Sequence, residues 1–230
     1  MSLLNIAIDG PAGAGKSSVA RRVAEIFNIF YFDTGALYRA VGFYMLKKGL
    51  FNRQNFNIED ELKFCALELK YLNRNQHIFL CGEDLNSHIR TGSVAAAASF
   101  VSRNLRVREY LLNMQRDFAK VNSVVMDGRD IGTVVLPGAN LKVFLTASLR
   151  ARAIRRYKEL ILKGGDYSFE DVFNNIKARD LSDSEREVAP LKVAKDAIVI
   201  DTTYFSLDES VKKVQSLVEQ LNLEEYIELL

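Results

Sequence analysis

The residues with the clearest chemistry lie in one short segment near the start of the chain. Residues 10–17 read Gly-Pro-Ala-Gly-Ala-Gly-Lys-Ser and match the pattern G-x-x-x-x-G-K-[ST]. Glycines let such a loop turn tightly enough for successive N–H groups to point at phosphate oxygens. In this pattern Lys16 reaches the β- and γ-phosphates and the Ser17 hydroxyl ligates Mg²⁺. We therefore predict a nucleoside triphosphate cradle made of Gly10, Pro11, Ala12, Gly13, Ala14, Gly15, Lys16, Ser17 and Ser18.

Further groups of charged residues are candidates for a second anion site. They are the segments 33–39 (DTGALYR) and 127–130 (DGRD), the cluster Arg150, Arg152, Arg155 and Arg156, and the set Arg179, Asp183 and Arg186. The last set is spaced i, i+4 and i+7, so its members can share one side of a helix. An enzyme that phosphorylates a small acceptor needs such a site, because the acceptor must lie in line with the γ-phosphate. The alternatives are a solvated helix face at 150–156 and a salt-bridge ladder at 179–186.

The elements that must position these groups follow a strand–helix–strand order. Apolar runs predict buried strands at 3–9, 29–32, 123–127, 141–146 and 197–200, and helical spacing predicts helices at 17–27 and 36–48. This order implies a parallel sheet with right-handed crossovers. The strand at 123–127 ends in Asp127, as a Walker B strand does, and acceptors bind at such strand ends. We therefore expect the candidate groups at one edge of the sheet.

The pattern changes between about 50 and 92, which we interpret as an insertion. It contains a helical pattern at 59–69 and two strand-like pieces at 67–72 and 77–81. Residues 94–119 return to long helical periodicity, and a final helix starts with the capping box Ser206…Glu209. The sequence therefore predicts an α/β three-layer fold with two inserted elements.

Length and composition limit the function classes. The chain has 230 residues, which suits one domain with insertions. Its net charge of +2 creates no overall electrostatic field that would hold a nucleic acid polymer. Two cysteines without a CxxC pair and two histidines do not suggest structural zinc. Neither a signal peptide nor a membrane span is expected, and no long apolar stripe remains for an interface. We expect a cytoplasmic monomer.

Together these motifs resemble the bacterial cytidylate kinase family. The resemblance rests on G-P-A-G-A-G-K-S-S at 10–18, D-T-G-A-L-Y-R at 33–39, V-R-E at 107–109, D-G-R-D-I-G-T-V-V at 127–135 and R-D-L-S-D-S-E-R-E-V-A-P-L at 179–191. It extends from about residue 4 to about residue 220. It implies one P-loop kinase domain with a core at about 1–49, 93–150 and 190–230, a monophosphate-binding insertion at about 50–92 and a short lid at about 150–189.

The resemblance also implies a reaction and a set of roles. The reaction is transfer of the ATP γ-phosphoryl group to CMP or dCMP with Mg²⁺. Matched positions make Thr34, Ser99, Arg108 and Asp130 contacts of the pyrimidine nucleotide, place Arg39, Arg129 and Arg186 at its phosphate, and place Arg179 and Asp183 near its sugar. The expected catalytic cations are Lys16, Arg129, Arg152, Arg156, Arg179 and Arg186. The family often has Gly-Thr or Ser-Thr after the cradle lysine, where this chain has Ser17 and Ser18, and either hydroxyl can serve Mg²⁺.

Two rival functions remain open at this point. One is a kinase of another monophosphate such as UMP, or of a different small alcohol. The other is a P-loop protein that binds or hydrolyses a nucleotide without a small acceptor. A carboxylate at Asp130 can accept from the 4-amino group of cytosine, and Arg108 can donate to its ring acceptors. Uracil presents a carbonyl instead, so this pairing favours cytosine.

Overall fold

The structure is a computed structural model that describes residues 3–52 and 57–227, with side chains for residues 3–51 and 57–221. The chain forms two compact units. One unit comprises the chain up to Phe30 and from Asn122 onward, and the other comprises Tyr31–Val121. The predicted insertion at 50–92 falls in the second unit, and its residues 53–56 lie outside the described residues.

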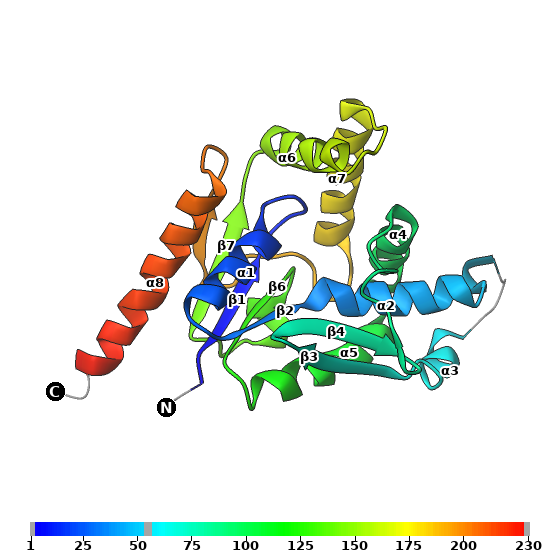
Figure 1. Cartoon of the computed structure of the whole chain (residues 1–230), viewed down its shortest axis with the longest axis horizontal. Coiled ribbons are helices and arrows are strands. Elements are labelled where there is room, and N and C mark those ends of the chain that lie inside the picture. The colour runs from blue at the N-terminus through cyan, green and yellow to red at the C-terminus, as the bar shows by residue number, and fades with distance from the viewer. Residues whose placement is uncertain (1–2, 53–56, 228–230) are drawn as a thin grey trace. The chain divides into compact units, whose positions relative to one another are not determined.

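The central sheet has five strands in the order β2-β6-β1-β7-β8 (Figure 1). Their bounds are Asn5–Asp9 for β1, Phe30–Asp33 for β2, Val124–Gly128 for β6, Leu141–Thr146 for β7 and Ile198–Asp201 for β8. β1 pairs in parallel with both β6 and β7, and β7 pairs in parallel with β8. Strand β1 has a neighbouring strand on each side, and its central residues 6–8 are apolar and fully buried because both faces of the sheet are covered. The predicted α/β fold around a parallel sheet is confirmed.

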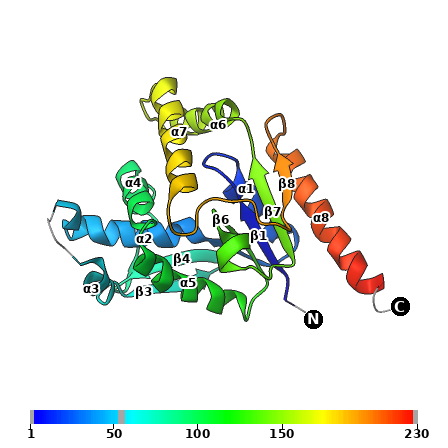
Figure 2. The ribbon, with the colours of Figure 1, turned by 180° about the vertical axis from the view of Figure 1, so that it is seen from behind.

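Helices of the first unit pack on this sheet (Figures 1 and 2). α1 (Lys16–Ile26) packs on β6 and on α8 (Leu207–Ile227), and α8 also contacts β7. The predicted capping box starts α8: Ser206 N donates to Glu209 Oε2 at 2.7 Å, and Glu209 N donates to Ser206 Oγ at 3.2 Å. The paired helices α6 (Leu149–Leu162) and α7 (Phe169–Glu185) occupy the predicted lid region.

The second unit combines helices with a small antiparallel sheet. Its helices are α2 (Thr34–Lys47), α3 (Ile58–Leu62), α4 (Gly92–Val101) and α5 (Leu105–Ala119), with a 3₁₀ turn at Leu50–Asn52. Its sheet consists of β3 (Leu67–Leu72), β4 (Asn75–Leu80) and β5 (Glu83–Asp84) in that order. α2 is the common support, since it contacts α4, α5 and β4.

Two helix predictions in this unit are wrong in extent. The helix predicted at 59–69 stops at Leu62, because the alternating residues that follow pair as β3 with β4. The helix predicted at 94–119 is two helices, because Asn104 accepts from the N–H groups of Arg106 at 2.9 Å and Val107 at 3.2 Å and so starts α5 anew. The break lies between the two residues of this stretch, Ser99 and Arg108, that the resemblance assigns to the acceptor.

The close packing of α2 on α4 depends on Gly42. A Cβ at this position would lie 2.8 Å from Ala98 N and 3.0 Å from Ala97 Cβ. We expect Gly42→Ala to lower the free energy of unfolding by about 1–3 kcal/mol, because overpacking outweighs the better helix propensity of alanine. Urea unfolding measures this, with Gly92→Ala as the control, since a Cβ at Gly92 meets nothing within 4 Å. Equal stability of the two variants would contradict the packing argument.

Candidate active site

The glycine-rich loop connects the carboxyl end of β1 to the first turn of α1. Gly10 has φ +147°, and a Cβ there would lie 1.9 Å from Leu145 O, so only glycine fits against β7. Gly15 has φ +89° at the N-terminal cap of α1. The loop thus presents the N-terminus of an 11-residue helix, which is a ready site for phosphate.

Lys16 is held inside this loop. It is 5% exposed, and its Nζ donates to Pro11 O at 2.7 Å. Burial lowers the pKa of Lys16 well below its ordinary value, the positive charge of Arg129 lowers it further, and the carboxylate of Asp127 opposes these effects. A phosphate group at the loop would add further negative charge and so stabilise the Lys16 ammonium.

Two side chains whose oxygens could ligate a metal lie together at the start of α1. Ser17 Oγ donates to Asp127 Oδ2 at 2.7 Å, so the residue predicted to end a Walker B strand meets the residue predicted to ligate the metal. A hydroxyl and a carboxylate are hard oxygen ligands, and Mg²⁺ commonly takes one or two such groups plus phosphate oxygens and water. This pair therefore fits Mg²⁺.

Asp9, which the sequence analysis did not single out, supports the segment 127–130. Its two carboxylate oxygens accept from Ile131 N at 2.8 Å and Gly132 N at 2.7 Å. These amides begin a π-helical turn, Ile131–Val135, directly after Asp130. Burial raises the pKa of Asp9 to about 6, although both amide hydrogen bonds lower it. The sequence feature that could have identified Asp9 is its position as the last residue of an apolar strand, directly before the glycine-rich loop.

Two ion pairs join the segment 127–130 to the end of α7. Arg129 Nε donates to Asp183 Oδ2 at 2.6 Å, and Arg186 NH2 donates to Asp130 Oδ1 at 3.2 Å. Burial would raise the pKa of Asp183, but the charge of Arg129 holds it below its ordinary value. Burial alone would lower the pKa of Arg129, but the negative charge of Asp183 and of other nearby carboxylates outweighs this effect. The pKa of Arg129 therefore lies above its ordinary value. Four of the predicted site residues are thereby brought together.

The predicted helical face of Arg179, Asp183 and Arg186 needs one correction. α7 ends at Glu185, so Arg186 lies just beyond it with an extended backbone. Its Nε donates to Ala189 O, and the proline at 190 that follows is typical of a chain that has left a helix. Arg179 is exposed on α7, and its charge acts on both Lys16 and Asp183.

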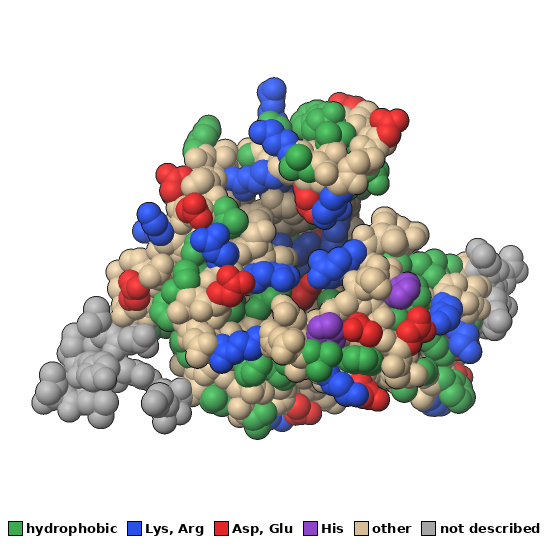
Figure 3. Space-filling view, in the orientation of Figure 1, with side chains coloured by type: hydrophobic (Ala, Val, Ile, Leu, Met, Phe, Trp, Pro, Cys, Tyr) green, Lys and Arg blue, Asp and Glu red, His purple; other side chains and the backbone are tan. Residues whose placement is uncertain are grey.

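The arginines of α6 separate into different environments. Arg152 is 7% exposed and donates from Nε to Ala147 O at 2.8 Å and from NH1 to Ala12 O at 2.9 Å. Arg155 bonds the segment before α8, where NH1 donates to Thr202 Oγ1 at 3.1 Å. Arg156 pairs with Glu159 on an exposed face, and Arg150 is also exposed. Of the cluster, only Arg152 contacts the glycine-rich loop in the described residues. In the space-filling view of Figure 3, Lys and Arg side chains gather around α6 and α7.

In the second unit, Thr34 and Arg39 lie on the first turns of α2. Asp33 caps this helix by accepting from Ala36 N at 3.0 Å, and its other oxygen accepts from Arg39 NH2 at 2.7 Å. Arg39 Nε is buried and has no hydrogen-bond partner among the described residues. A buried donor of this kind is costly unless a ligand satisfies it, so Arg39 fits an anion. Thr34, the first residue of α2, is 4% exposed.

Arg108 and Ser99 lie on the two helices that the sequence analysis joined. Arg108 is 6% exposed, its NH1 donates to Ser102 O at 3.3 Å, and its guanidinium lies 5.5 Å from the centre of the Tyr38 ring. Ser99 is half-buried on α4. The Tyr38 ring and the carbonyl of Ser102, in the turn after α4, thus fix the direction of the planar Arg108 guanidinium.

The raised pKa of Asp9 predicts a pH dependence of stability. The native state holds the Asp9 proton up to about pH 6, while the unfolded chain releases it near the ordinary value of 3.8. The native state therefore binds more protons in this window, and the contribution of Asp9 to stability falls as pH rises from about 4 to 6. Urea unfolding at several pH values measures this. The stability of Asp9→Asn relative to the unmodified protein should rise over that window, and a flat difference would contradict the burial argument.

Known proteins resemble this chain along nearly all of its length. The family model described as cytidylate kinase matches residues 6–220. The chain is 48% identical over 215 residues to the cytidylate kinase of Thermosipho melanesiensis, covering 94% of this chain and 96% of that protein. It is 47% identical over 217 residues to the cytidylate kinase of Caldicellulosiruptor bescii, with the same coverage of both chains.

A solved structure supports the fold alone. The gluconokinase from Sinorhizobium meliloti 1021 aligns with a TM-score of 0.50 at 16% identity, covering 98% of this chain and 97% of that one. Within residues 3–52 and 57–227, none of the helices is both long and apolar enough to span a bilayer.

Proposed function

Because this chain belongs to the cytidylate kinase family, we propose that it transfers the γ-phosphoryl group of ATP to CMP or dCMP, giving CDP or dCDP. The observation that carries the proposal is the cationic cluster at the glycine-rich loop. Lys16 is buried there, and the charges of Arg129 and Arg179 act on it. Such mutual repulsion is relieved when phosphate groups bind between the cations.

In this reaction a phosphate oxygen of the monophosphate forms a bond to the γ-phosphorus of ATP, and the bond to the β–γ bridging oxygen breaks. The attacking oxygen is already anionic at neutral pH, so no general base is required. The protein must instead reduce repulsion between two anions and stabilise the charge on the transferring group. We propose that Lys16 in the loop and Arg129, directly after β6, provide this positive charge. When bound at Ser17 and Asp127, Mg²⁺ supplies further positive charge at the phosphates.

The acceptor roles follow the family resemblance residue by residue. Thr34, Ser99, Arg108 and Asp130 are proposed to contact the pyrimidine nucleotide, Arg39, Arg129 and Arg186 its phosphate, and Arg179 and Asp183 its sugar. The buried donor of Arg39 supports its assignment to phosphate. The buried pair of Asp130 and Arg186 would give cytosine an acceptor of fixed direction, which uracil cannot use in the same way.

We further propose that α6 and α7 act as the lid of one kinase domain. Its core would comprise about 1–49, 93–150 and 190–230, and its monophosphate-binding insertion about 50–92. Closure would exclude water that would otherwise accept the phosphoryl group. Arg152 and Arg179 would then face the phosphates, and Arg156 would reach them only by leaving Glu159. We also propose that the enzyme is a monomer and that it acts in the cytoplasm, where both nucleotides are available.

A coupled ADP-release assay tests the proposal. It is run with ATP and Mg²⁺, first without acceptor and then with CMP, dCMP, UMP, AMP or GMP. ADP release that requires CMP or dCMP is the expected result. Release without acceptor would indicate a hydrolase, and release that UMP, AMP or GMP alone triggers would indicate a kinase of another monophosphate.

A further inference from the structure

Ala12 in the glycine-rich loop is held by side chains from α6 and α7. Its N–H donates to Asp180 Oδ1 at 3.1 Å, and its carbonyl accepts from Arg152 NH1 at 2.9 Å. Arg152 NH1 also pairs with Asp180 Oδ2. The two polar groups of one loop residue are therefore satisfied by an arginine and a carboxylate that also bind each other.

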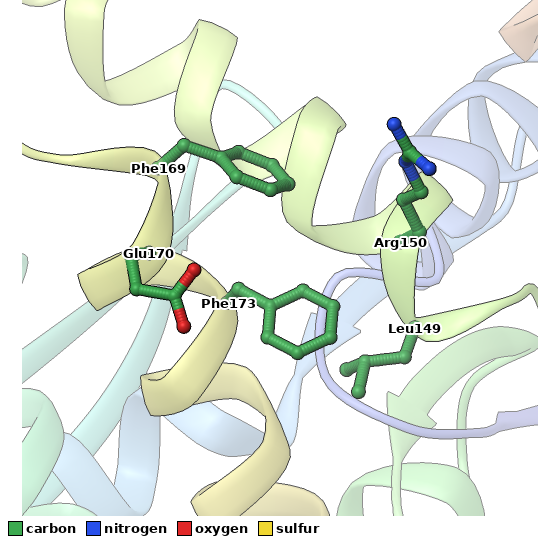
Figure 4. Close-up of a pocket in the computed structure, with 5 residues that line it drawn as sticks. All are labelled: Leu149, Arg150, Phe169, Glu170 and Phe173. Carbon is green, nitrogen blue, oxygen red and sulfur yellow. The ribbon is translucent and has the colours of Figure 1, made fainter.

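Apolar packing reinforces this attachment. The Ala12 side chain lies in a buried cluster with Ala153 of α6 and with Val172 and Ile176 of α7. Leu149, Phe169 and Phe173 pack against the same cluster, and Figure 4 shows these three residues around the hollow that opens at the first turns of the two helices. The loop and the two helices thus share one small core.

Asp180 has a central place in this arrangement. The residue before it on α7, Arg179, acts on Lys16, and the residue one turn later, Asp183, holds Arg129. Asp180 also adds negative charge near Arg129. The Asp180 carboxylate itself bonds the loop and Arg152, whereas Asp183 and Arg129 bind each other directly. Arg152 is fixed by the same carboxylate, which limits the directions that its guanidinium can take.

We propose that Asp180 is a positioning residue for ATP: its carboxylate clamps the Ala12 backbone and Arg152 together, so that the loop keeps the shape that binds phosphates. This inference rests on the proposed function, since it assigns ATP to the loop. Asp180 touches no phosphate in this role and acts through Ala12 and Arg152. The proposal predicts that loss of the Asp180 carboxylate weakens the binding of ATP, the donor, and does not weaken the binding of CMP, the acceptor.

The test measures dissociation constants for a fluorescent ATP analogue and for CMP in Asp180→Ala, Asp180→Asn and Arg152→Ala. Asp180→Ala should weaken the ATP analogue by about tenfold or more, as supporting partners of ligand-binding groups do, and leave CMP unchanged. Asp180→Asn keeps an oxygen for Ala12 N–H and loses the ionic partner of Arg152, so its defect should be intermediate. Glu185→Gln removes a charge from an exposed position on the same helix and is the matched control.

A double variant separates positioning from general damage. If Asp180 acts partly through Arg152, Asp180→Ala/Arg152→Ala should lose less affinity for the ATP analogue than the product of the two single losses. Multiplicative losses, equal weakening of ATP and CMP, or an unchanged ATP affinity would each overturn the proposal. Should Asp180→Ala fail to fold, the same comparison is made with Asp180→Asn. Because binding is the readout, failure of CMP phosphorylation in the unmodified protein would reject the proposed function separately.

Discussion

Arg186→Ala is expected to lower kcat by about two to five orders of magnitude, as the loss of other arginines that stabilise a transferring phosphoryl group does. Arg186 is buried, and its guanidinium is held between Ala189 O and the carboxylate of Asp130. Its charge is therefore fixed in direction before substrate binds, which is the condition for strong electrostatic stabilisation. Single-turnover phosphorylation of CMP measures the effect on the chemical step.

Stability has to be separated from catalysis in this variant. Removing Arg186 leaves Asp130 buried without this partner, and breaking a buried ion pair costs about 3–5 kcal/mol of folding free energy. Arg186→Ala/Asp130→Asn also removes the charge of Asp130, so its thermal midpoint should lie above that of Arg186→Ala. Asp130→Asn alone measures how far the change at this proposed base contact lowers kcat. A loss of less than about tenfold in folded Arg186→Ala would reject a transition-state role for the residue.

The sheet and the glycine-rich loop were predictable because their signals are local. An apolar run before a glycine pattern, followed by helical spacing, specifies β1, the loop and α1 within one stretch of sequence. The strand ending in Asp127 and the capping box at Ser206 are local signals of the same kind. Helix boundaries were less predictable, because Asn104 continues the helical spacing in sequence while its side chain starts a new helix.

The residues that sequence analysis missed act over long separations in the chain. Asp9 bonds amides more than 120 residues away, and Asp180 bonds an amide 168 residues away. No spacing rule connects such partners, since their contact exists only once the sheet and helices have assembled. Arg156 illustrates the reverse case: its place in an arginine cluster suggested catalysis, yet its contact is with Glu159, one helical turn along α6.

These contacts also suggest why the loop needs more than its glycines. Glycines allow its left-handed turns but do not hold them, because they carry no side chain and lose more conformational entropy than other residues. Asp180 and Arg152 provide the missing attachment at Ala12, and Lys16 provides it at Pro11. In this view the cradle is preorganised by charged side chains that would each be unfavourable in isolation.

Lys16→Met is therefore expected to separate stability from activity. Methionine keeps the unbranched apolar stem of lysine and removes an ammonium whose pKa burial and Arg129 have lowered. Relief of this unfavourable charge should offset the lost hydrogen bond to Pro11 O, so the thermal midpoint should change little. Activity should fall by about 10²–10³-fold, the usual cost of removing one preorganised group that stabilises transition-state charge. Thermal unfolding and the coupled assay with CMP measure the two effects on the same preparation. A marked loss of stability would show that Lys16 mainly supports the loop through Pro11 O, and an unchanged kcat would remove it from the reaction.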